Sequence, residues 1–184
     1  RMMKQAEKFN RPVITFIDTK GAYPGVEAEQ RGQGEAIAKS MFELAKLTVP
    51  VIAIVIGEGS SGGALAIGVA NKVIMLENAI YSILSPEGYS SILWKDSSRF
   101  KEAADRMKLT AIDLYDMGII ETIIKEPAIK DRKKTSQSVY FEMIASEIKK
   151  EIQTTVQELK SKTKDEIVEE RYQKFRKISG FKEV

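Results

Sequence analysis

Apolar and polar residues alternate in blocks along the chain, and these blocks predict strands followed by helices. The longest uninterrupted apolar run covers residues 49–56 and is rich in valine and isoleucine, which is typical of a strand buried on both faces. Residues 11–18 form a second predicted strand, with Pro12 near its start, where no ladder hydrogen bond is lost. Between them, residues 27–47 carry apolar side chains at helical spacing, so we expect a long helix there.

Shorter blocks complete the pattern. Three more strands are predicted at residues 72–76, 81–84 and 118–124. Helices are predicted at residues 1–10, 64–70, 90–95, 98–107, 110–116, 135–160 and 165–178, with a turn at 85–88 and a capping box formed by Thr163 and Glu166. Because strands and helices alternate in this order, we expect an α/β protein with a largely parallel, buried sheet.

Composition narrows the chemistry. The chain of 184 residues contains no cysteine and no histidine, which excludes disulfides, thiolate or histidine metal ligands and a histidine general base. Its net charge of +3 is small, and the mixed charges of the C-terminal third are typical of solvated helix faces rather than of a nucleic-acid site. No apolar run is long enough to span a membrane and no secretory signal is visible, which indicates a cytoplasmic protein.

The apolar run at 49–56 leads into a glycine-rich segment, GEGSSGG at residues 57–63, followed by a predicted helix. A strand, a glycine loop and a helix N-terminus together present unpaired backbone N–H groups, which bind anions or developing oxyanions. Gly57, Gly59 and Gly62 have the spacing of a dinucleotide-binding fingerprint, and Glu77 follows at the distance expected of its acidic residue. This pattern favours a nicotinamide-dependent oxidoreductase.

The same glycine segment is compatible with three other hypotheses. Gly59-x-Ser61-x-Gly63 has the form of a nucleophile elbow, although the chain contains no histidine to activate Ser61. A third reading needs no side chain, because the backbone N–H groups of Gly62 and Gly63 would form an oxyanion hole. A tight strand-to-helix turn without any ligand stays open beside these three.

Several longer motifs carry a resemblance to a known family. They are DTKGAYPG at residues 18–25, AEQRGQ at 28–33, GEGSSGGALAIG at 57–68 and SPEG at 85–88. In this order they resemble the carboxyltransferase α subunit of bacterial acetyl-CoA carboxylase, from residue 1 to about residue 127 and more loosely beyond. Two positions depart from the pattern: Lys20 stands where some relatives have proline, and Ser60 where some have glycine.

The resemblance implies a ClpP/crotonase-like fold, which is a spiral of ββα units. Residues 1–127 would be the second part of the crotonase-like carboxyltransferase core, and residues 128–184 a C-terminal helical segment. The chain starts at Arg1 in a helical stretch that lacks a capping residue. We therefore expect that the N-terminal part of the subunit, with the early strands of the spiral, is missing.

The resemblance also implies an activity, in which the carboxyl group of carboxybiotin on a carrier protein passes to acetyl-CoA and gives malonyl-CoA. This is the first committed step of fatty acid biosynthesis. The expected partners are the carboxyltransferase β subunit in an α₂β₂ assembly, the biotin carboxyl carrier protein and biotin carboxylase. The chain itself is expected to hold no cofactor or metal, since the zinc and the thioester-side donors belong to the β subunit.

By the same resemblance, Gly62 and Gly63 would form the biotin-side oxyanion hole and Arg31 would grip a carboxylate. The other substrate-binding candidates are Gly21, Ala22, Tyr23, Pro24, Gly25, Glu58 and Gly59. Structural alternatives stand beside them: Arg31 would form a surface ion pair with Glu27 or Glu35, and Glu58 would bond nearby backbone N–H groups. This chain could also be a non-catalytic scaffold subunit, because a complete active site needs a partner subunit.

Overall fold

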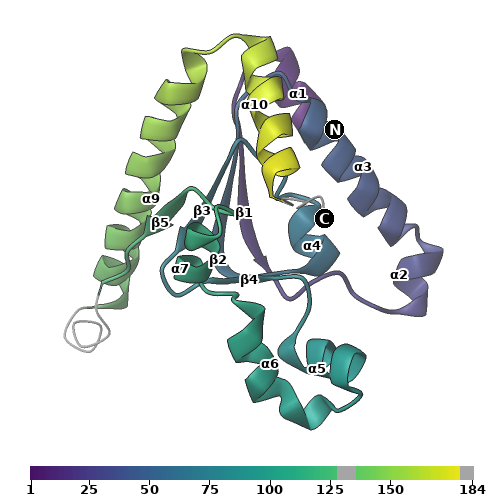
Figure 1. The fold of residues 1–184 in the computed structure, drawn as a ribbon. Helices are drawn as coiled ribbons and strands as arrows, with labels where there is room; N and C mark the ends of the chain where they lie inside the picture. The colour runs from purple at the N-terminus through teal and green to yellow at the C-terminus, as the bar shows by residue number, and fades with distance from the viewer. Residues whose placement is uncertain (128–135, 179–184) are drawn as a thin grey trace, which may run out of the picture.

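The computed structural model describes residues 1–127 and 136–178, and a five-stranded sheet lies at its centre (Figure 1). The strands are β1 (Val13–Thr19), β2 (Val51–Ser60), β3 (Lys72–Leu76), β4 (Ile80–Ser82) and β5 (Thr122–Ile124). Their order is β1-β2-β3-β5, while β4 pairs with the C-terminal part of β2, and each strand pairing is parallel. The predicted parallel sheet, with the strand at 49–56 in its centre, is confirmed.

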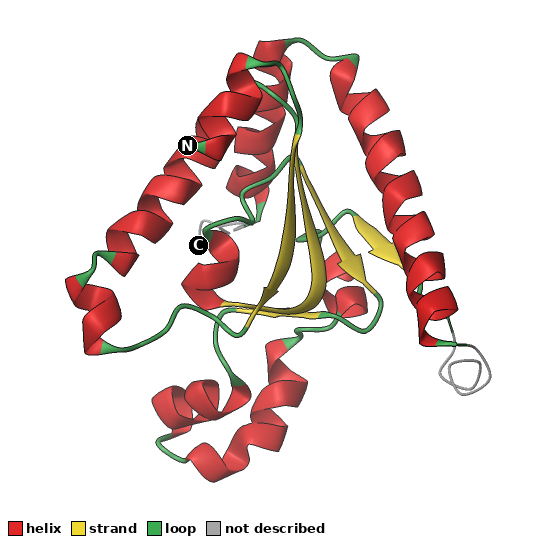
Figure 2. Ribbon diagram, turned by 180° about the vertical axis from the view of Figure 1, so that it is seen from behind, coloured by secondary structure: helices red, strands yellow, loops and turns green. Residues whose placement is uncertain are grey.

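Helices cover both faces of this sheet. They are α1 (Met2–Lys8), α2 (Val26–Gln30), α3 (Gln33–Lys46), α4 (Ser61–Leu65), α5 (Pro86–Trp94), η1 (Ser97–Arg99), α6 (Phe100–Met107), α7 (Ala111–Asp116), α9 (Gln137–Lys160) and α10 (Lys164–Lys177). Figure 1 shows α9 on one side of the sheet and α1, α3 and α10 on the other. Figure 2 shows that the arrows of the strands point towards a separate lobe made of α5 and α6.

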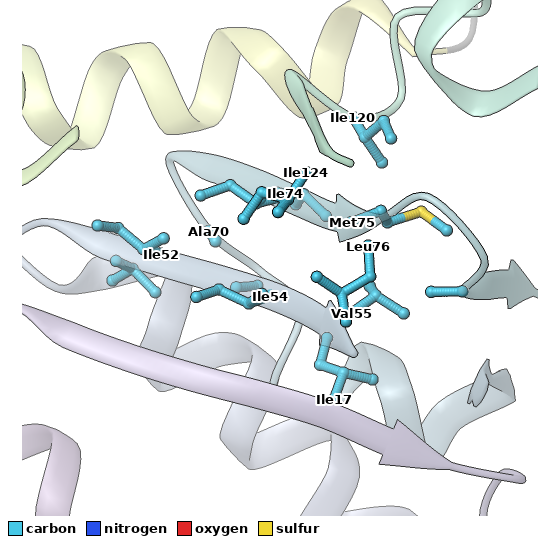
Figure 3. Close-up of a cluster of buried hydrophobic side chains, with 14 of the residues drawn as sticks. Ile17, Ile52, Ile54, Val55, Ala70, Ile74, Met75, Leu76, Ile120 and Ile124 are labelled. Atoms are coloured by element: carbon cyan, nitrogen blue, oxygen red, sulfur yellow. The ribbon is translucent and has the colours of Figure 1, made fainter. Parts of the chain in front are cut away.

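The buried strand predicted at 49–56 forms the core. Val51 to Val55 have no exposed surface, because helices cover both faces of the sheet and β1 and β3 pair with the two edges of β2. Figure 3 shows Val55 close to Ile17 of β1, and Ile74 of β3 close to Ile124 of β5. A continuous run of apolar side chains is what a strand in this position requires.

Several expected elements differ from the structure. The helix predicted at 64–70 covers Ser61–Leu65, and the strand predicted at 118–124 covers Thr122–Ile124 alone. The predicted helix at 27–47 is interrupted at Arg31, because Gly32 adopts a positive φ of 76° and turns the chain into a new helix. The segment at 57–60 is not a loop, because β4 pairs with it and draws it into β2. The predicted turn at 85–88 is the start of α5, where the Ser85 hydroxyl accepts a hydrogen bond from the N–H of Gly88 at 3.1 Å.

The last two helices pack on the core described above. The side chain of Thr122 on β5 donates to Glu151 on α9 at 3.3 Å, and Lys72 on β3 pairs with Glu158 on α9 at 3.2 Å. The predicted capping box at Thr163 is confirmed at the start of α10. The expected helix start at residue 135 lies outside the described residues, and the division of the chain at residues 127 and 128 stays a prediction.

One side chain of α10 reaches the base of the sheet. Arg171 is only 1% exposed, although it lies in a charged helix that the sequence predicted to be solvated. Its guanidinium donates to the carbonyl oxygens of Leu44 (2.7 Å), Leu47 (2.8 Å) and Val49 (3.0 Å), and to Asn71 Oδ1 (2.6 Å). Asn71 Oδ1 also accepts the N–H of Val51 at 3.1 Å.

Arg171 and these acceptors are called the Arg171 hub below. The hub joins α10 to the end of α3, to the start of β2 and to Asn71, which precedes β3. Burial lowers the pKa of Arg171 to about 10, and the nearby charge of Glu7 partly opposes this effect. The guanidinium therefore stays charged at neutral pH. Its charge meets carbonyl oxygens at the C-terminal end of α3, where the helix dipole is negative.

Arg171→Met should lower the free energy of unfolding by about 3–5 kcal/mol, because several buried acceptors lose their donor at once. Arg171→Lys should recover only part of the loss, since an ammonium reaches fewer of these acceptors. Urea unfolding followed by circular dichroism measures both variants. Arg176→Met, at an exposed position of the same helix, is the control and should change stability by at most about 0.5 kcal/mol. An Arg171→Met chain as stable as the parent would show that the hub is dispensable.

Candidate functional site

The turn from β2 into α4 brings the predicted oxyanion donors into position. Ser61 has a positive φ of 57°, an uncommon conformation for a residue other than glycine, and this sharp turn starts the helix directly after the strand. Gly62 and Gly63 lie in the first helical turn, where backbone N–H groups have no partner within the helix. Within residues 1–127 and 136–178, neither N–H has a hydrogen-bond acceptor.

The loop at 21–25 packs directly against this turn. A Cβ atom on Gly63 would lie 2.9 Å from the carbonyl carbon of Gly21 and 3.0 Å from the nitrogen of Ala22, so only glycine fits without moving the loop. Gly21 itself has a positive φ of 122°. Tyr23 is 70% exposed, and its ring lies over Gly25. Of the predicted substrate-binding residues, Gly21 and Ala22 therefore contact the oxyanion candidates directly.

Arg31 lies in the turn between α2 and α3 and is exposed. In the described part of the chain its guanidinium forms no ion pair, so the surface pairs with Glu27 or Glu35 that the sequence allowed are absent. The structure does not bring Arg31 into contact with Gly62. The side chain of α3 that lies against Gly62 is Ile37, whose Cδ1 would lie 3.2 Å from a Cβ on Gly62.

Glu58 and Gly59 lie in β2 rather than in a ligand loop. Gly59 pairs with Thr19 of β1 and Tyr81 of β4, and a Cβ on Gly59 would lie 3.0 Å from the Tyr81 ring. The N–H of Glu58 donates to Asp18, while its side chain is exposed. The backbone of this segment is thus used within the sheet and does not form a free glycine loop.

The geometry also argues against a dinucleotide-binding site at Gly57, Gly59 and Gly62. The carboxylate of Glu77 accepts the N–H of Glu126 beyond β5 at 3.2 Å, instead of facing the glycine segment. Helix α4 has only five residues, which is short for the helix that carries a pyrophosphate in that fold. Across the described residues, no group of three or more Asp or Glu side chains is placed to hold a metal ion.

A pocket of about 610 Å³ adjoins the oxyanion candidates. Ser61 and Gly62 line it together with apolar and aromatic side chains that come from most elements between α4 and α7 and from α10, and Arg106 and Lys108 contribute the cations. The apolar and aromatic members are Leu65, Val73, Tyr81, Ile83, Tyr89, Met107, Leu114, Met117, Ile119, Phe175 and Ile178. Burial raises the pKa of the Tyr81 hydroxyl, which keeps it neutral at physiological pH.

Sequence reasoning missed most of this pocket. Tyr89 contacts Trp94 edge to face, with the ring centroids 5.6 Å apart, and it also lines the pocket. Phe175 and Ile178 come from the last helix, more than a hundred residues after Gly62. No local spacing signals such a combination, because the lining residues meet only through the packing of β4, α5 and α10.

Solved structures with the same arrangement show the fold class. A Pseudomonas malonate decarboxylase hetero-tetramer in complex with coenzyme A matches 92% of this chain and 66% of that chain, with a TM-score of 0.71 and 15% identity. The transcarboxylase 12S structure matches 78% of this chain and 29% of that chain, with a TM-score of 0.61 and 24% identity. The chain therefore has the crotonase-like α/β fold that the motifs implied.

Curated proteins give much higher identity. The acetyl-coenzyme A carboxylase carboxyl transferase subunit alpha of Clostridium botulinum (strain Alaska E43 / Type E3) is 60% identical over 178 residues, which cover 97% of this chain and 63% of that protein. The subunit of the same name from Staphylococcus epidermidis (strain ATCC 12228 / FDA PCI 1200) is 56% identical over 180 residues, which cover 98% of this chain and 55% of that protein. The chain thus spans a little over half of these relatives' length.

A family model covers almost the whole chain. The family is described as acetyl co-enzyme A carboxylase carboxyltransferase-like, and its model matches residues 1–179. This range includes both the turn at Gly62 and the last helix that completes the pocket. The chain therefore belongs to the acetyl co-enzyme A carboxylase carboxyltransferase-like family.

Proposed function

We propose that this chain supplies the biotin side of the carboxyltransferase site of acetyl-CoA carboxylase, in which a carboxyl group passes from carboxybiotin to acetyl-CoA and gives malonyl-CoA. The observation that carries the proposal is the pair of N–H groups on Gly62 and Gly63, free among the described residues beside an apolar pocket. The identity to proteins named as the alpha subunit of this enzyme supports it.

In the proposed reaction the bond between the carboxyl carbon and the ureido nitrogen breaks, and CO₂ departs. Negative charge then develops on the ureido oxygen of biotin, and the N–H groups of Gly62 and Gly63 stabilise it by hydrogen bonds. The ureido anion takes a proton from the methyl group of acetyl-CoA, and the resulting enolate carbon attacks CO₂. Losing one such donor typically costs about 3 kcal/mol of transition-state stabilisation. No histidine is needed, which agrees with the composition.

Arg31 is assigned to the carboxylate of carboxybiotin. Its guanidinium is exposed and has no ion-pair partner among the described residues, so both of its outer nitrogens are available for a two-point contact. The loop of Gly21, Ala22, Tyr23, Pro24 and Gly25 would form the wall of the site. Glu58 and Gly59 would shape the floor, with Gly59 acting through its missing side chain.

The site needs partners in this proposal. The thioester-side donors and the zinc-bearing segment would belong to the carboxyltransferase β subunit in an α₂β₂ assembly. The substrate would arrive on the biotin carboxyl carrier protein after charging by biotin carboxylase, in the cytoplasm. In the described part of the chain, no helix combines the length and the apolar character needed to cross a membrane.

An uncovered apolar surface is consistent with such an assembly. Strand β1 lies at the edge of the sheet, and Phe16 (52%) and Ile14 (36%) on its outer face are exposed together with Ile56 (38%) of β2. Parallel sheets are normally covered on both faces, so a further polypeptide segment is expected to bury these side chains.

The chain alone should show no carboxyltransfer between carboxybiotin and acetyl-CoA, because the thioester oxygen would find no donor pair. Adding the β subunit and the rest of the α subunit should restore malonyl-CoA formation, measured by mass spectrometry. Malonyl-CoA formed by the isolated chain would contradict this division of labour. An assembled enzyme that is indifferent to loss of the Gly62–Gly63 turn would favour the scaffold alternative.

Arg31→Lys should lower kcat/KM for the biotin substrate roughly ten- to a hundredfold, because an ammonium keeps the charge but loses the planar two-point contact. The KM for acetyl-CoA should barely change. Ser61→Ala is the comparison and should leave the rate within about a few fold, since its hydroxyl is assigned no chemical step. Steady-state kinetics of the assembled enzyme, with each substrate varied separately, measures both. An inactive Ser61→Ala beside a normal Arg31→Lys would reverse the assignment.

A further inference from the structure

The pairing of β1 with β2 changes register just before the candidate site. Ile17 pairs with Val55, but Thr19 pairs with Gly59. Between these two pairs β1 contributes Asp18 alone, whereas β2 contributes Ile56, Gly57 and Glu58. Such a bulge bends the strand and leaves extra backbone groups of β2 without a partner in the ladder.

Asp18 provides a partner for one of these backbone groups. Its Oδ1 accepts the backbone N–H of Glu58 at 3.0 Å. A Cβ on Gly57 would lie only 2.5 Å from the same oxygen and 3.0 Å from the carboxyl carbon, so the Asp18 carboxylate occupies the space of a side chain at position 57. The contact among Asp18, Gly57 and Glu58 is called the Asp18 clasp below.

The Asp18 clasp lies just before the two parts of the candidate site, which are the loop at 21–25 and the turn into α4. The chain continues from Asp18 through two residues to Gly21, and from Glu58 through two residues to Ser61. These two ends meet again, because a Cβ on Gly21 would lie 3.2 Å from the Cβ of Ser61. A fixed spacing at the clasp therefore sets how the loop at 21–25 faces the N–H groups of α4.

The clasp is not required to hold the sheet together. Five register pairs, from Val13 with Val51 to Ile17 with Val55, join the two strands upstream of it, and the β2 side of these pairs is fully buried. Asp18 itself is exposed and lies at the end of this ladder. Its loss should change the local geometry much more than the stability of the fold.

We propose that Asp18 is a positioning residue for carboxyltransfer, which holds the donors of Gly62 and Gly63 against the loop at 21–25. The inference rests on the proposed function, but the clasp itself can be tested without any activity. Its role is that of an oxygen acceptor, so Asp18→Asn should preserve it and Asp18→Ala should remove it.

The first experiment measures amide hydrogen exchange in this chain by NMR. The N–H of Glu58 should exchange roughly tenfold faster in Asp18→Ala than in the parent, and close to the parent rate in Asp18→Asn. Gly57→Ala should also accelerate exchange at Glu58, because the new methyl group displaces the carboxylate. In the Asp18→Ala background it should add almost nothing, since the colliding group is gone. Unchanged protection in Asp18→Ala, or additive effects, would overturn the clasp.

The second experiment measures kinetics of the assembled enzyme. Asp18→Ala should lower kcat about tenfold with the KM for acetyl-CoA within about twofold, and Asp18→Asn should restore most of the rate. Asp165→Ala, an exposed carboxylate at the start of α10, is the matched control and should leave both constants unchanged.

The two experiments separate the possible failures. Loss of protection at Glu58 with an unchanged kcat would refute the positioning role, while the clasp would stand as a structural contact. An Asp18→Asn enzyme that is impaired although Glu58 stays protected would mean that the carboxylate acts directly, which also refutes the proposal. If the parent assembly makes no malonyl-CoA, the proposed function fails, and the exchange data still decide whether the clasp exists.

Discussion

Strand β2 pairs in parallel with three strands, β1, β3 and β4, and the rest of the structure depends on this arrangement. Its first half lies between β1 and β3, and the apolar side chains of Val51 to Val55 are completely buried there. Its second half turns towards β4, where Gly59 leaves room for the Tyr81 ring, while Gly57 leaves room for Asp18 of β1. The candidate site therefore begins where the strand ends, and the glycines before it serve the pairing and packing of β2.

Local sequence signals predicted the parts of the fold that depend on local physics. The apolar run at 49–56 identified the central strand, and Thr163 with Glu166 identified the start of α10. The same reasoning failed where a distant partner decides the conformation. Gly57 to Ser60 look like a loop until β4 pairs with them, and Arg171 looks like one more surface charge until it meets the carbonyl oxygens of residues 44–49.

In the candidate site, too, some residues could be predicted from local sequence and others could not. Gly62 and Gly63 could be named from sequence because a backbone donor pair depends only on the strand, the turn and the helix that follow one another. The pocket beside them could not, because Tyr81, Tyr89 and Phe175 meet only in the folded chain. Arg31 is intermediate: the sequence placed it near a helix start, while the break at Gly32 places it in an exposed turn.

The Arg171 hub also has a consequence for the order in which the chain folds. Arg171 and Asn71 are 100 residues apart in sequence, and the carbonyl of Leu44 lies 127 residues before Arg171. During synthesis the strands leave the ribosome before Arg171 has been made. Contacts between residues so far apart in sequence are also slow to form. The carbonyl oxygens of Leu44, Leu47 and Val49 would therefore lack this donor until α10 emerges, so the base of the sheet is completed only after the strands that it joins have been made.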